Sequence, residues 1–162
     1  MAFNISVSFN EPIIHATFTL PTGKVSDTVR DCRYIIQETV ELLEVKSEPV
    51  YRIYDFGDAN VPLIHLTMIC AEESKSKFGS FSDPQVRGIV VSSDPALTET
   101  MRKLRSNYNL TDMAVFTTIE QAYDYARSQL RIDQFLRDTL DNAWLSSPYQ
   151  VGADHNTTEQ EE

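Results

Sequence analysis

Residues 3–9 alternate strictly between apolar and polar side chains. From Phe3 to Phe9 every odd position is apolar and every even position is Asn or Ser. A period of two is typical of a β-strand with one buried face. Asn10-Glu11-Pro12 ends this pattern, and residues 13–20 have the composition of a second strand. Because so short a turn joins them, we predict that the two strands form an antiparallel hairpin.

A helical period replaces this alternation at Val25. Between residues 25 and 45 the apolar side chains recur at steps of three and four, which places them on one face of a helix. The residues predicted to form this inward face are Val25, Val29, Cys32, Ile36, Val40 and Leu43. The charged residues between them are expected to face solvent.

Strands and helices alternate along the rest of the chain. We predict strands at residues 50–54, 89–91 and 113–117, with a loop at residues 55–61. Helices are predicted to start near Pro62, Asp94 and Thr118, since each of these residue types favours the start of a helix. The fourth helix is expected to turn five residues inward, namely Ile119, Ala122, Tyr123, Ala126 and Leu130.

The resulting order is strand–strand–helix–strand–helix–strand–helix–strand–helix. Strands separated by helices favour right-handed crossovers and a parallel sheet. We therefore predict an α/β fold with a mixed, mostly parallel five-stranded sheet, an N-terminal antiparallel hairpin and four or more helices. Residues 1–145 are assigned to this single domain, within which residues 131–145 form a helical extension that packs back on the rest. Residues 146–162 are polar and acidic, and we predict that they form a flexible tail.

The charge of the chain restricts its partners. With 24 acidic and 14 basic residues, its formal net charge is −10. Nucleic acids and anionic membranes both attract a basic surface. We therefore expect no nucleic-acid partner and no docking on a membrane. No segment reaches the length of about 18 apolar residues that a membrane span needs.

The two cysteines, Cys32 and Cys70, lie far apart in the sequence and form no CxxC pair. We interpret both as small buried hydrophobic residues of a protein in a reducing compartment. The N-terminus MAFNISVSF has neither the positive region nor the long apolar core of a secretory signal. The sequence thus predicts a cytoplasmic protein.

The residues that could perform chemistry do not follow a known motif. His15, His65 and His155 fall on a strand, a helix and the tail, with no HxxxH or Glu-x-x-His spacing. The chain has no GxxxxGK[ST] or GxGxxG loop, and Ser92-Ser93 lacks the GxSxG context of an activated nucleophile. We therefore predict no catalytic residue, no metal site and no cofactor.

Three stretches carry a family resemblance, namely Leu20–Asp27, Val50–Phe56 and Met113–Ala122. Together with the order of elements they make residues 1–131 resemble a loose branch of the STAS domains, the family of anti-sigma-factor antagonists. The resemblance implies a docking module that is not an enzyme. In the best-known members a serine at the start of the helix after the third strand is phosphorylated. Here that place holds Asp58-Ala59-Asn60, so the phosphorylation switch is not expected, and Asp58 is interpreted as a turn residue.

The second predicted helix is apolar around nearly its whole circumference in its first two turns. A helix that lies on a sheet needs an apolar stripe of only about 100°. Either both of its sides are covered within the domain, for example by the C-terminal extension, or one side is an interface. Our hypothesis is a protein-contact face formed by Asp58, Asn60, Leu63 and Leu66, with Leu66 pointing outward. Its partner would be a regulatory protein or a second copy in a homodimer.

These observations leave three hypotheses for function. The leading one is a non-catalytic protein-interaction or regulatory module of STAS-like type. The alternative is a carrier of a small ligand or lipid, with a pocket lined by Tyr51, Tyr54, Phe56, Phe78 and Phe81. A small hydrolase or isomerase is the third, and it would require a deep cleft with polar groups of shifted pKa.

Overall fold

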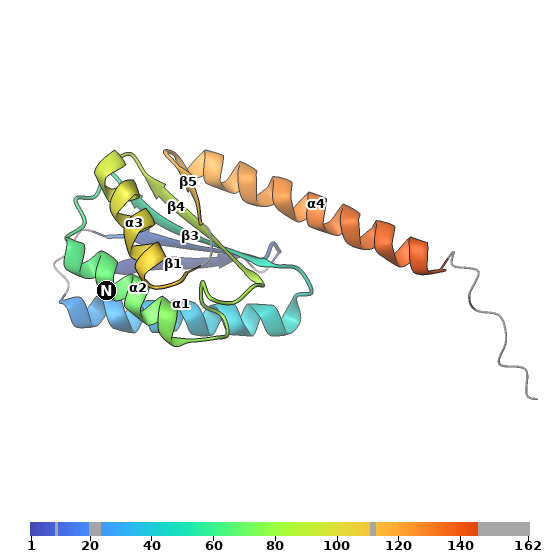
Figure 1. Cartoon of the computed structure of the whole chain (residues 1–162), viewed down its shortest axis with the longest axis horizontal. Coiled ribbons are helices and arrows are strands. Elements are labelled where there is room, and N and C mark those ends of the chain that lie inside the picture. Colours follow the sequence, from blue (N-terminus) through green and yellow to red (C-terminus); the bar gives the residue numbers. More distant parts are fainter. Residues whose placement is uncertain (9, 20–23, 111–112, 146–162) are drawn as a thin grey trace, which may run out of the picture.

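A computed structural model describes residues 1–8, 10–19, 24–110 and 113–145 of the chain, with side chains described up to residue 140 (Figure 1). Its elements are, in chain order, β1 (Phe3–Ser8), β2 (Ile13–Phe18), α1 (Val25–Val45), β3 (Val50–Gly57), α2 (Leu63–Lys75), β4 (Val86–Ser92), α3 (Pro95–Asn107), β5 (Met113–Phe116) and α4 (Ile119–Leu145). The predicted α/β fold and its order of elements are confirmed. The loop predicted at residues 55–61 is wrong over its first three residues, because β3 continues to Gly57.

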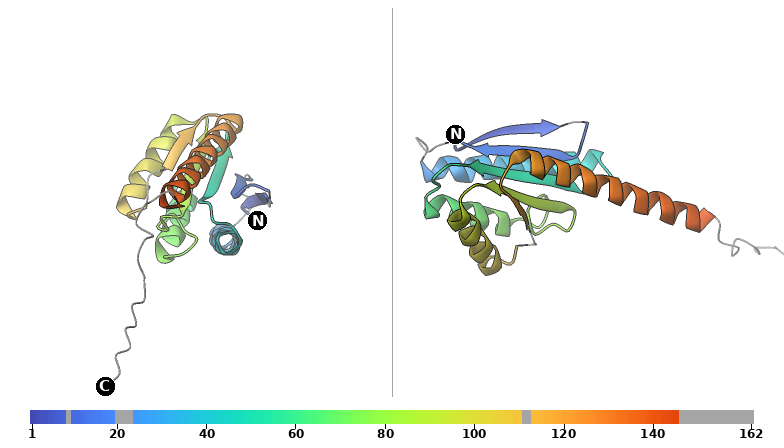
Figure 2. Two further views of the ribbon diagram at one scale, coloured as in Figure 1. Left: turned by 90° about the vertical axis from the view of Figure 1, so that its right-hand side faces the viewer. Right: turned by 90° about the horizontal axis from the view of Figure 1, so that it is seen from above.

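The strands lie in the order β1-β2-β3-β4-β5 across one sheet. β1 and β2 are antiparallel, with Phe3 opposite Phe18 and Ser8 opposite Ile13, and β2 to β5 are parallel. Crossovers between parallel strands are right-handed, so strands that follow one another in this way place their connecting helices on the same face. Accordingly, α1, α2 and α3 cover one face of the sheet and α4 lies on the other (Figures 1 and 2).

Each face of the sheet has its own hydrophobic core. The larger core lies between the sheet and α1–α3, and the smaller one lies between the sheet and α4. Residues Ile89 to Val91 alternate between the two cores and are all buried, as the apolar run predicted. Ala122 and Ala126 of α4 have no exposed surface, so this helix lies close on the strands. Ile119, Tyr123 and Leu130 complete the predicted inward face.

The second half of α4 leaves the sheet and projects beyond it (Figures 1 and 2). The prediction that residues 131–145 pack back on the domain is wrong for the large apolar side chains described in this segment, although Asp133 and Arg137 still contact Tyr51 and Glu48. Phe135, Leu136 and Leu140 have exposed fractions of 69%, 52% and 59%. The predicted tail at residues 146–162 lies outside the described residues. None of the helices in the described part of the chain combines the length and the apolarity that crossing a membrane requires.

The inward face of α1 differs from the predicted one. Of the six residues expected there, only Cys32 is fully buried, and the other five lie at the margins of the buried face. The residues that α1 buries are Thr28, Asp31, Cys32, Ile35, Thr39 and Leu42. Half of them are polar, and each of these has a hydrogen-bond partner on β1, β3 or α2. Periodicity alone assigns such residues to the solvent side, because polar side chains are mostly exposed.

Candidate functional site

The predicted contact residues lie at the carboxyl edge of the sheet, where β3 leads into α2. Asp58 and Asn60 are both exposed. The Ser93 hydroxyl donates to Asp58 Oδ1 at 2.6 Å, and the Ser93 N–H donates to the Gly57 carbonyl oxygen at 3.1 Å. Gly57 has a φ of +49°, a conformation that glycine adopts without strain. Asp58 therefore ties the β3–α2 connection to the β4–α3 connection while it remains exposed.

Leu63 and Leu66 lie on different sides of α2. The exposed fraction of Leu63 is 60%, whereas that of Leu66 is 2%. The expectation that Leu66 points outward is therefore wrong. α2 lies on the sheet between α1 and α3, so most of its apolar circumference is covered within the domain. Leu63 and its neighbour Ile64, with an exposed fraction of 48%, remain accessible.

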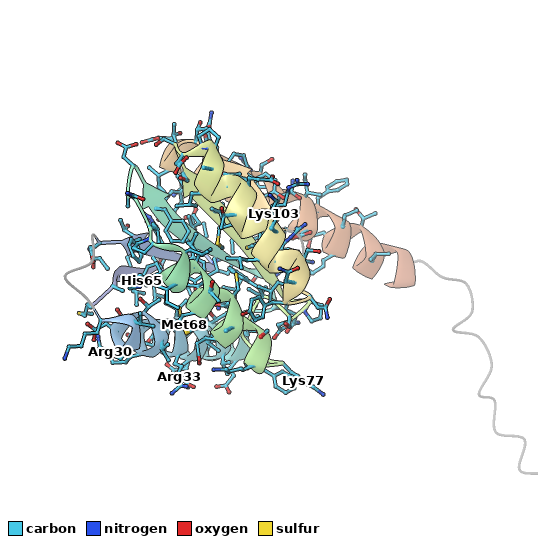
Figure 3. The ribbon with its side chains drawn as sticks, turned by 60° about the vertical axis from the view of Figure 1, so that its left-hand side comes forward. Arg30, Arg33, His65, Met68, Lys77 and Lys103 are labelled. Atoms are coloured by element: carbon cyan, nitrogen blue, oxygen red, sulfur yellow. The ribbon has the colours of Figure 1, made fainter. Side chains whose placement is uncertain are left out.

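The outward side of α2 carries apolar and cationic side chains, and Figure 3 labels Met68 of this side together with Arg33 of the neighbouring α1. Ile64, the half-buried Met68 and Lys75 follow one another along this side of the helix. Arg33 reaches the row from α1, because its Nε–H donates to Glu72 at 2.9 Å, and Lys75 binds the same carboxylate. We call Arg33, Ile64, Met68 and Lys75 the α2 face.

The electrostatics of the α2 face depend on Glu72, which lies beneath the two cations with an exposed fraction of 5%. Burial alone would raise the pKa of Glu72, but hydrogen bonds from Lys75 and Arg33 outweigh it and the pKa is lowered. The side chains of Arg33 and Lys75 are 66% and 61% exposed. Their cationic heads are therefore accessible while the carboxylate is hidden. This surface suits an apolar partner residue with acidic neighbours.

A second polar cluster lies on the opposite face of the sheet, beside α4. His15 Nε2 is 3.3 Å from Asp55 Oδ2 and 3.2 Å from Thr17 Oγ1, and His15 Nδ1 is 3.2 Å from the Tyr123 hydroxyl oxygen. Each ring nitrogen of His15 therefore has a polar partner within hydrogen-bond distance. Through its two ring nitrogens, His15 of β2 thus connects β2 to β3 and to α4. The sequence pattern does not associate these residues, because three separate segments supply them.

A fully buried charge, Arg52, is also not predicted by the sequence pattern. Arg52 of β3 has no exposed surface, and its guanidinium binds Glu73 of α2 and donates to the Gly79 carbonyl oxygen at 2.7 Å. The Tyr54 hydroxyl donates to the same glutamate at 2.7 Å, and the Phe81 ring lies 4.2 Å from the guanidinium carbon. Burial alone would lower the pKa of Arg52, but attraction to Glu73 outweighs it and the pKa is raised. The signal in the sequence was a single charge among the apolar and aromatic residues 50–54.

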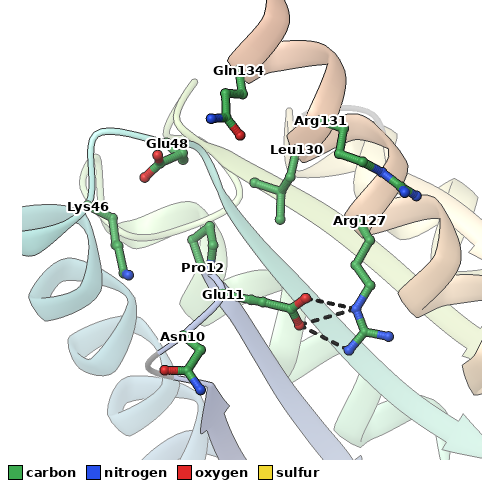
Figure 4. A pocket seen from close by; sticks show the side chains of 9 residues that line it. All are labelled: Asn10, Glu11, Pro12, Lys46, Glu48, Arg127, Leu130, Arg131 and Gln134. Atoms are coloured by element: carbon green, nitrogen blue, oxygen red, sulfur yellow. Dashed lines mark hydrogen bonds and ion pairs between the residues drawn. The ribbon is translucent and has the colours of Figure 1, made fainter.

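A hollow of about 360 Å³ lies between the β1–β2 turn, the end of α1 and α4 (Figure 4). Its lining consists of Asn10, Glu11, Pro12, Lys46, Glu48, Arg127, Leu130, Arg131 and Gln134. Arg127 donates to Glu11 at 2.9 and 3.1 Å, which holds the hairpin against α4. Seven of its nine lining residues are polar or charged and the hollow is open to solvent, unlike the enclosed apolar wall of a typical ligand pocket.

The aromatic residues expected to line a carrier pocket do not meet in one. Tyr54, Phe56 and Phe81 belong to the core under α1–α3, whereas Tyr51 packs under α4. The sheet separates Tyr51 from the others because side chains along a strand alternate between its faces. Phe78 is 74% exposed. These side chains therefore give the carrier hypothesis no pocket.

Within the described residues, no group of three His, Cys, Asp or Glu side chains is arranged to hold a metal ion. Comparisons of the chain with protein-family models, with curated proteins and with solved structures found no match. The resemblance to STAS domains therefore depends on the three sequence stretches and the order of elements.

Proposed function

We propose that this protein is a non-catalytic protein-interaction module of STAS-like type and that its partner docks on the α2 face. The observation that carries the proposal is the exposure of Ile64, 48%, at the start of a helix whose other sides are covered by α1, α3 and the sheet. A cytoplasmic location, favoured by the two unpaired cysteines, is part of the same proposal.

The composition of the α2 face favours a protein as the partner. The centres of protein interfaces are enriched in apolar residues, Met and Arg, and among these Arg buries an apolar stem while its end remains polar. Ile64 and Met68 supply the apolar centre here, and Arg33 and Lys75 supply cationic heads at its margin. In a chain with a net charge of −10, such a face favours a partner with acidic residues around an apolar one.

The polar cluster beside α4 supports a structural role over a catalytic one. Both ring nitrogens of His15 are engaged with Asp55, Thr17 and Tyr123. A general base needs a free lone pair toward the proton that it removes, and here both ring nitrogens already have partners within the domain.

Ile64→Asp tests the proposed face. Tagged full-length protein captures its partners from an extract of the source cells, and mass spectrometry compares the variants. We expect the partner captured by the wild type to be lost with Ile64→Asp. With the purified partner, calorimetry should show affinity weakened by at least about tenfold, as for a residue in the centre of an interface.

Val115→Asp is the matched control, because Val115 is 43% exposed on β5, at the edge of the sheet farthest from α1. This variant should keep the partner, and circular dichroism melting should show that both variants fold. Equal capture by the wild type and Ile64→Asp, with loss in Val115→Asp, would move the docking site away from the α2 face.

A further inference from the structure

The strand β5 lies at an edge of the sheet. It pairs with β4 on one side, and in the described part of the chain no strand pairs with its other side. The backbone N–H and C=O groups of alternate residues point to opposite sides of a strand, so half of those in β5 point away from β4. All four residues of β5 are apolar, and its pairing with β4 runs in continuous register. Charged residues, proline and bulges are what keeps other chains from an edge strand, and β5 has none of them.

A groove of about 220 Å³ lies between β5, β4 and α3. Its floor is apolar and buried, because Val90 has no exposed surface and Met101 is only 2% exposed. Val115 of β5, with an exposed fraction of 43%, also lines the groove. Arg102 and Arg105 of α3 add cationic side chains to an otherwise mostly apolar lining.

The side chains of β5 show how a strand added at this edge meets the groove. Met113 and Val115 line the groove, whereas Ala114 and Phe116 pack against α4 on the other face of the sheet. Because side chains alternate along a strand, every second side chain of an added strand faces α3. One of these side chains lies beside the apolar floor, and those two residues before and after it lie closer to the cationic side chains of α3.

The charge of α3 favours an acidic segment as the added strand. This helix contains three cationic residues and one acidic residue, whereas each of the other described helices has more acidic than basic residues. Its carboxylate, Glu99, is shared by Arg102 and Lys103, at 2.9 and 3.5 Å. The side chains of these two cations are 67% and 72% exposed, and Figure 3 labels Lys103 on this helix. In a chain with a net charge of −10, α3 therefore places positive potential beside the groove.

We infer that the edge of β5 binds an extended acidic segment of another protein, which adds to the sheet as a further strand. The backbone of this segment pairs with the outer side of β5, and one apolar side chain enters the groove. Acidic side chains two residues away on the same face approach Arg102. In this mode of recognition the main-chain hydrogen bonds supply affinity and the pocket for alternate side chains supplies specificity. The inference does not depend on the α2 face, which offers a partner the side of a helix.

Synthetic peptides test the site on the full chain. The probes are blocked, fluorescently labelled peptides with the order Thr-Asp-Thr-Leu-Thr-Asp-Thr, and the same peptide with Val or Phe at its centre. Fluorescence polarisation should show saturable binding of at least one of them. Val115→Asp places a carboxylate in the groove and should weaken this binding by at least about tenfold. Ile64→Asp makes the same change at an exposed apolar residue of α2 and should bind like the wild type. Absence of binding by all three peptides, or equal binding by a folded Val115→Asp, overturns the inference.

Backbone methylation tests whether the peptide adds as a strand. N-methyl groups on every second residue remove the N–H donors along one side of an extended peptide and leave those along the other side. Of the two possible sets of alternate residues, one should abolish binding and the other should leave it close to that of the unmodified peptide. Equal effects of the two sets would mean that side chains alone hold the peptide, and strand addition would be wrong.

A charge reversal tests the preference for an acidic segment. Arg102→Glu should weaken binding of the Asp peptides by about tenfold and should bind peptides with Lys in place of Asp more tightly than the wild type does. Lys77→Glu changes the net charge equally at an exposed residue outside the groove and should change neither affinity. Failure of this exchange overturns the assignment of an acidic segment. A wild type that sediments as a dimer, and a Val115→Asp that does not, would assign the edge to a second copy of the chain and also overturn the inference.

Discussion

The buried ion pair between Arg52 of β3 and Glu73 of α2 holds α2 on the sheet. Neither side chain is exposed, and the Tyr54 hydroxyl and the Phe81 N–H also donate to Glu73. Arg52→Met would leave the Glu73 carboxylate buried without its counter-ion. Breaking a buried pair in this way destabilises a protein by about 3–5 kcal/mol. We expect a loss of this size in the free energy of unfolding measured with urea.

Two further variants separate the charge from the packing. Arg52→Met combined with Glu73→Leu removes both charges, so it should recover most of the stability, because apolar residues can replace a buried pair. Tyr54→Phe removes one hydrogen bond to the same charged carboxylate and should destabilise by about 1.5–3 kcal/mol, less than the loss of the counter-ion. If Arg52→Met unfolds at the wild-type urea concentration, the pair does not stabilise the helical layer.

Cys32 and Cys70 should be unreactive in the folded protein. Both are buried, and burial raises the pKa of each thiol, that of Cys70 to about 12. The thiolate, which is the reactive form, is therefore scarce at mildly alkaline pH. With a chromogenic thiol reagent we expect no rapid reaction of the native protein and two reactive thiols per chain in concentrated urea. Rapid labelling without urea would show that the helical layer opens locally.

Between elements, Glu72 connects α1 to α2 and should make stability depend on pH. Its pKa is lowered in the folded state, so the unfolded chain binds the proton more readily. The stabilisation is therefore complete above the unfolded pKa and is lost as the pH falls through the folded value. Glu72→Gln should be less stable than the wild type at neutral pH, and the two unfolding free energies should converge in acid. The difference should stay below about 1 kcal/mol, because Arg33 and Lys75 are exposed and screened.

Glu44→Gln is the control for this titration. Glu44 is an exposed residue of α1 without an ion pair in the described part of the chain. Its substitution should leave the wild-type dependence of stability on pH unchanged. If the difference in unfolding free energy between Glu72→Gln and the wild type stays constant as the pH falls, the carboxylate of Glu72 does not hold α1 and α2 together.

The same elements show where sequence patterns succeed and where they fail. The buried run Ile89–Val91 and the inward residues of α4 were predicted because apolar side chains there contact apolar neighbours. Thr28, Asp31 and Thr39 of α1 were missed, because their burial depends on hydrogen-bond partners from other elements. The spacing of residues along one helix gives no information about hydrogen-bond partners in other elements.

The candidate site was only partly accessible from the sequence for a related reason. The exposed positions of Asp58 and Asn60 followed from their loop composition. The burial of Leu66 did not, because the apolar pattern of α2 does not reveal that α1 and α3 lie on both sides of it. Likewise, Arg33 belongs to the α2 face only because α1 packs alongside α2.

At the scale of the whole molecule, α4 is half inside and half outside the domain. Its apolar spacing continues from Ile119 to Leu140, but only the first half has a sheet beneath it. The spacing indicates the length of the helix and not the width of the sheet, so the projecting half was assigned to a packed extension. The same spacing that forms a core at one end leaves exposed apolar side chains at the other.

Hydrogen exchange measured by mass spectrometry should divide α4 into these two halves. Amides of residues 119–130 should be protected at every protein concentration, because the sheet holds that part of the helix. Amides of residues 132–140 should exchange more quickly, because in the described residues no sheet lies beneath this part of the helix and its large apolar side chains are exposed. Equal protection of the two halves would mean that the contacts of Asp133 and Arg137 with Tyr51 and Glu48 stabilise the projecting half as well as the sheet stabilises the first half.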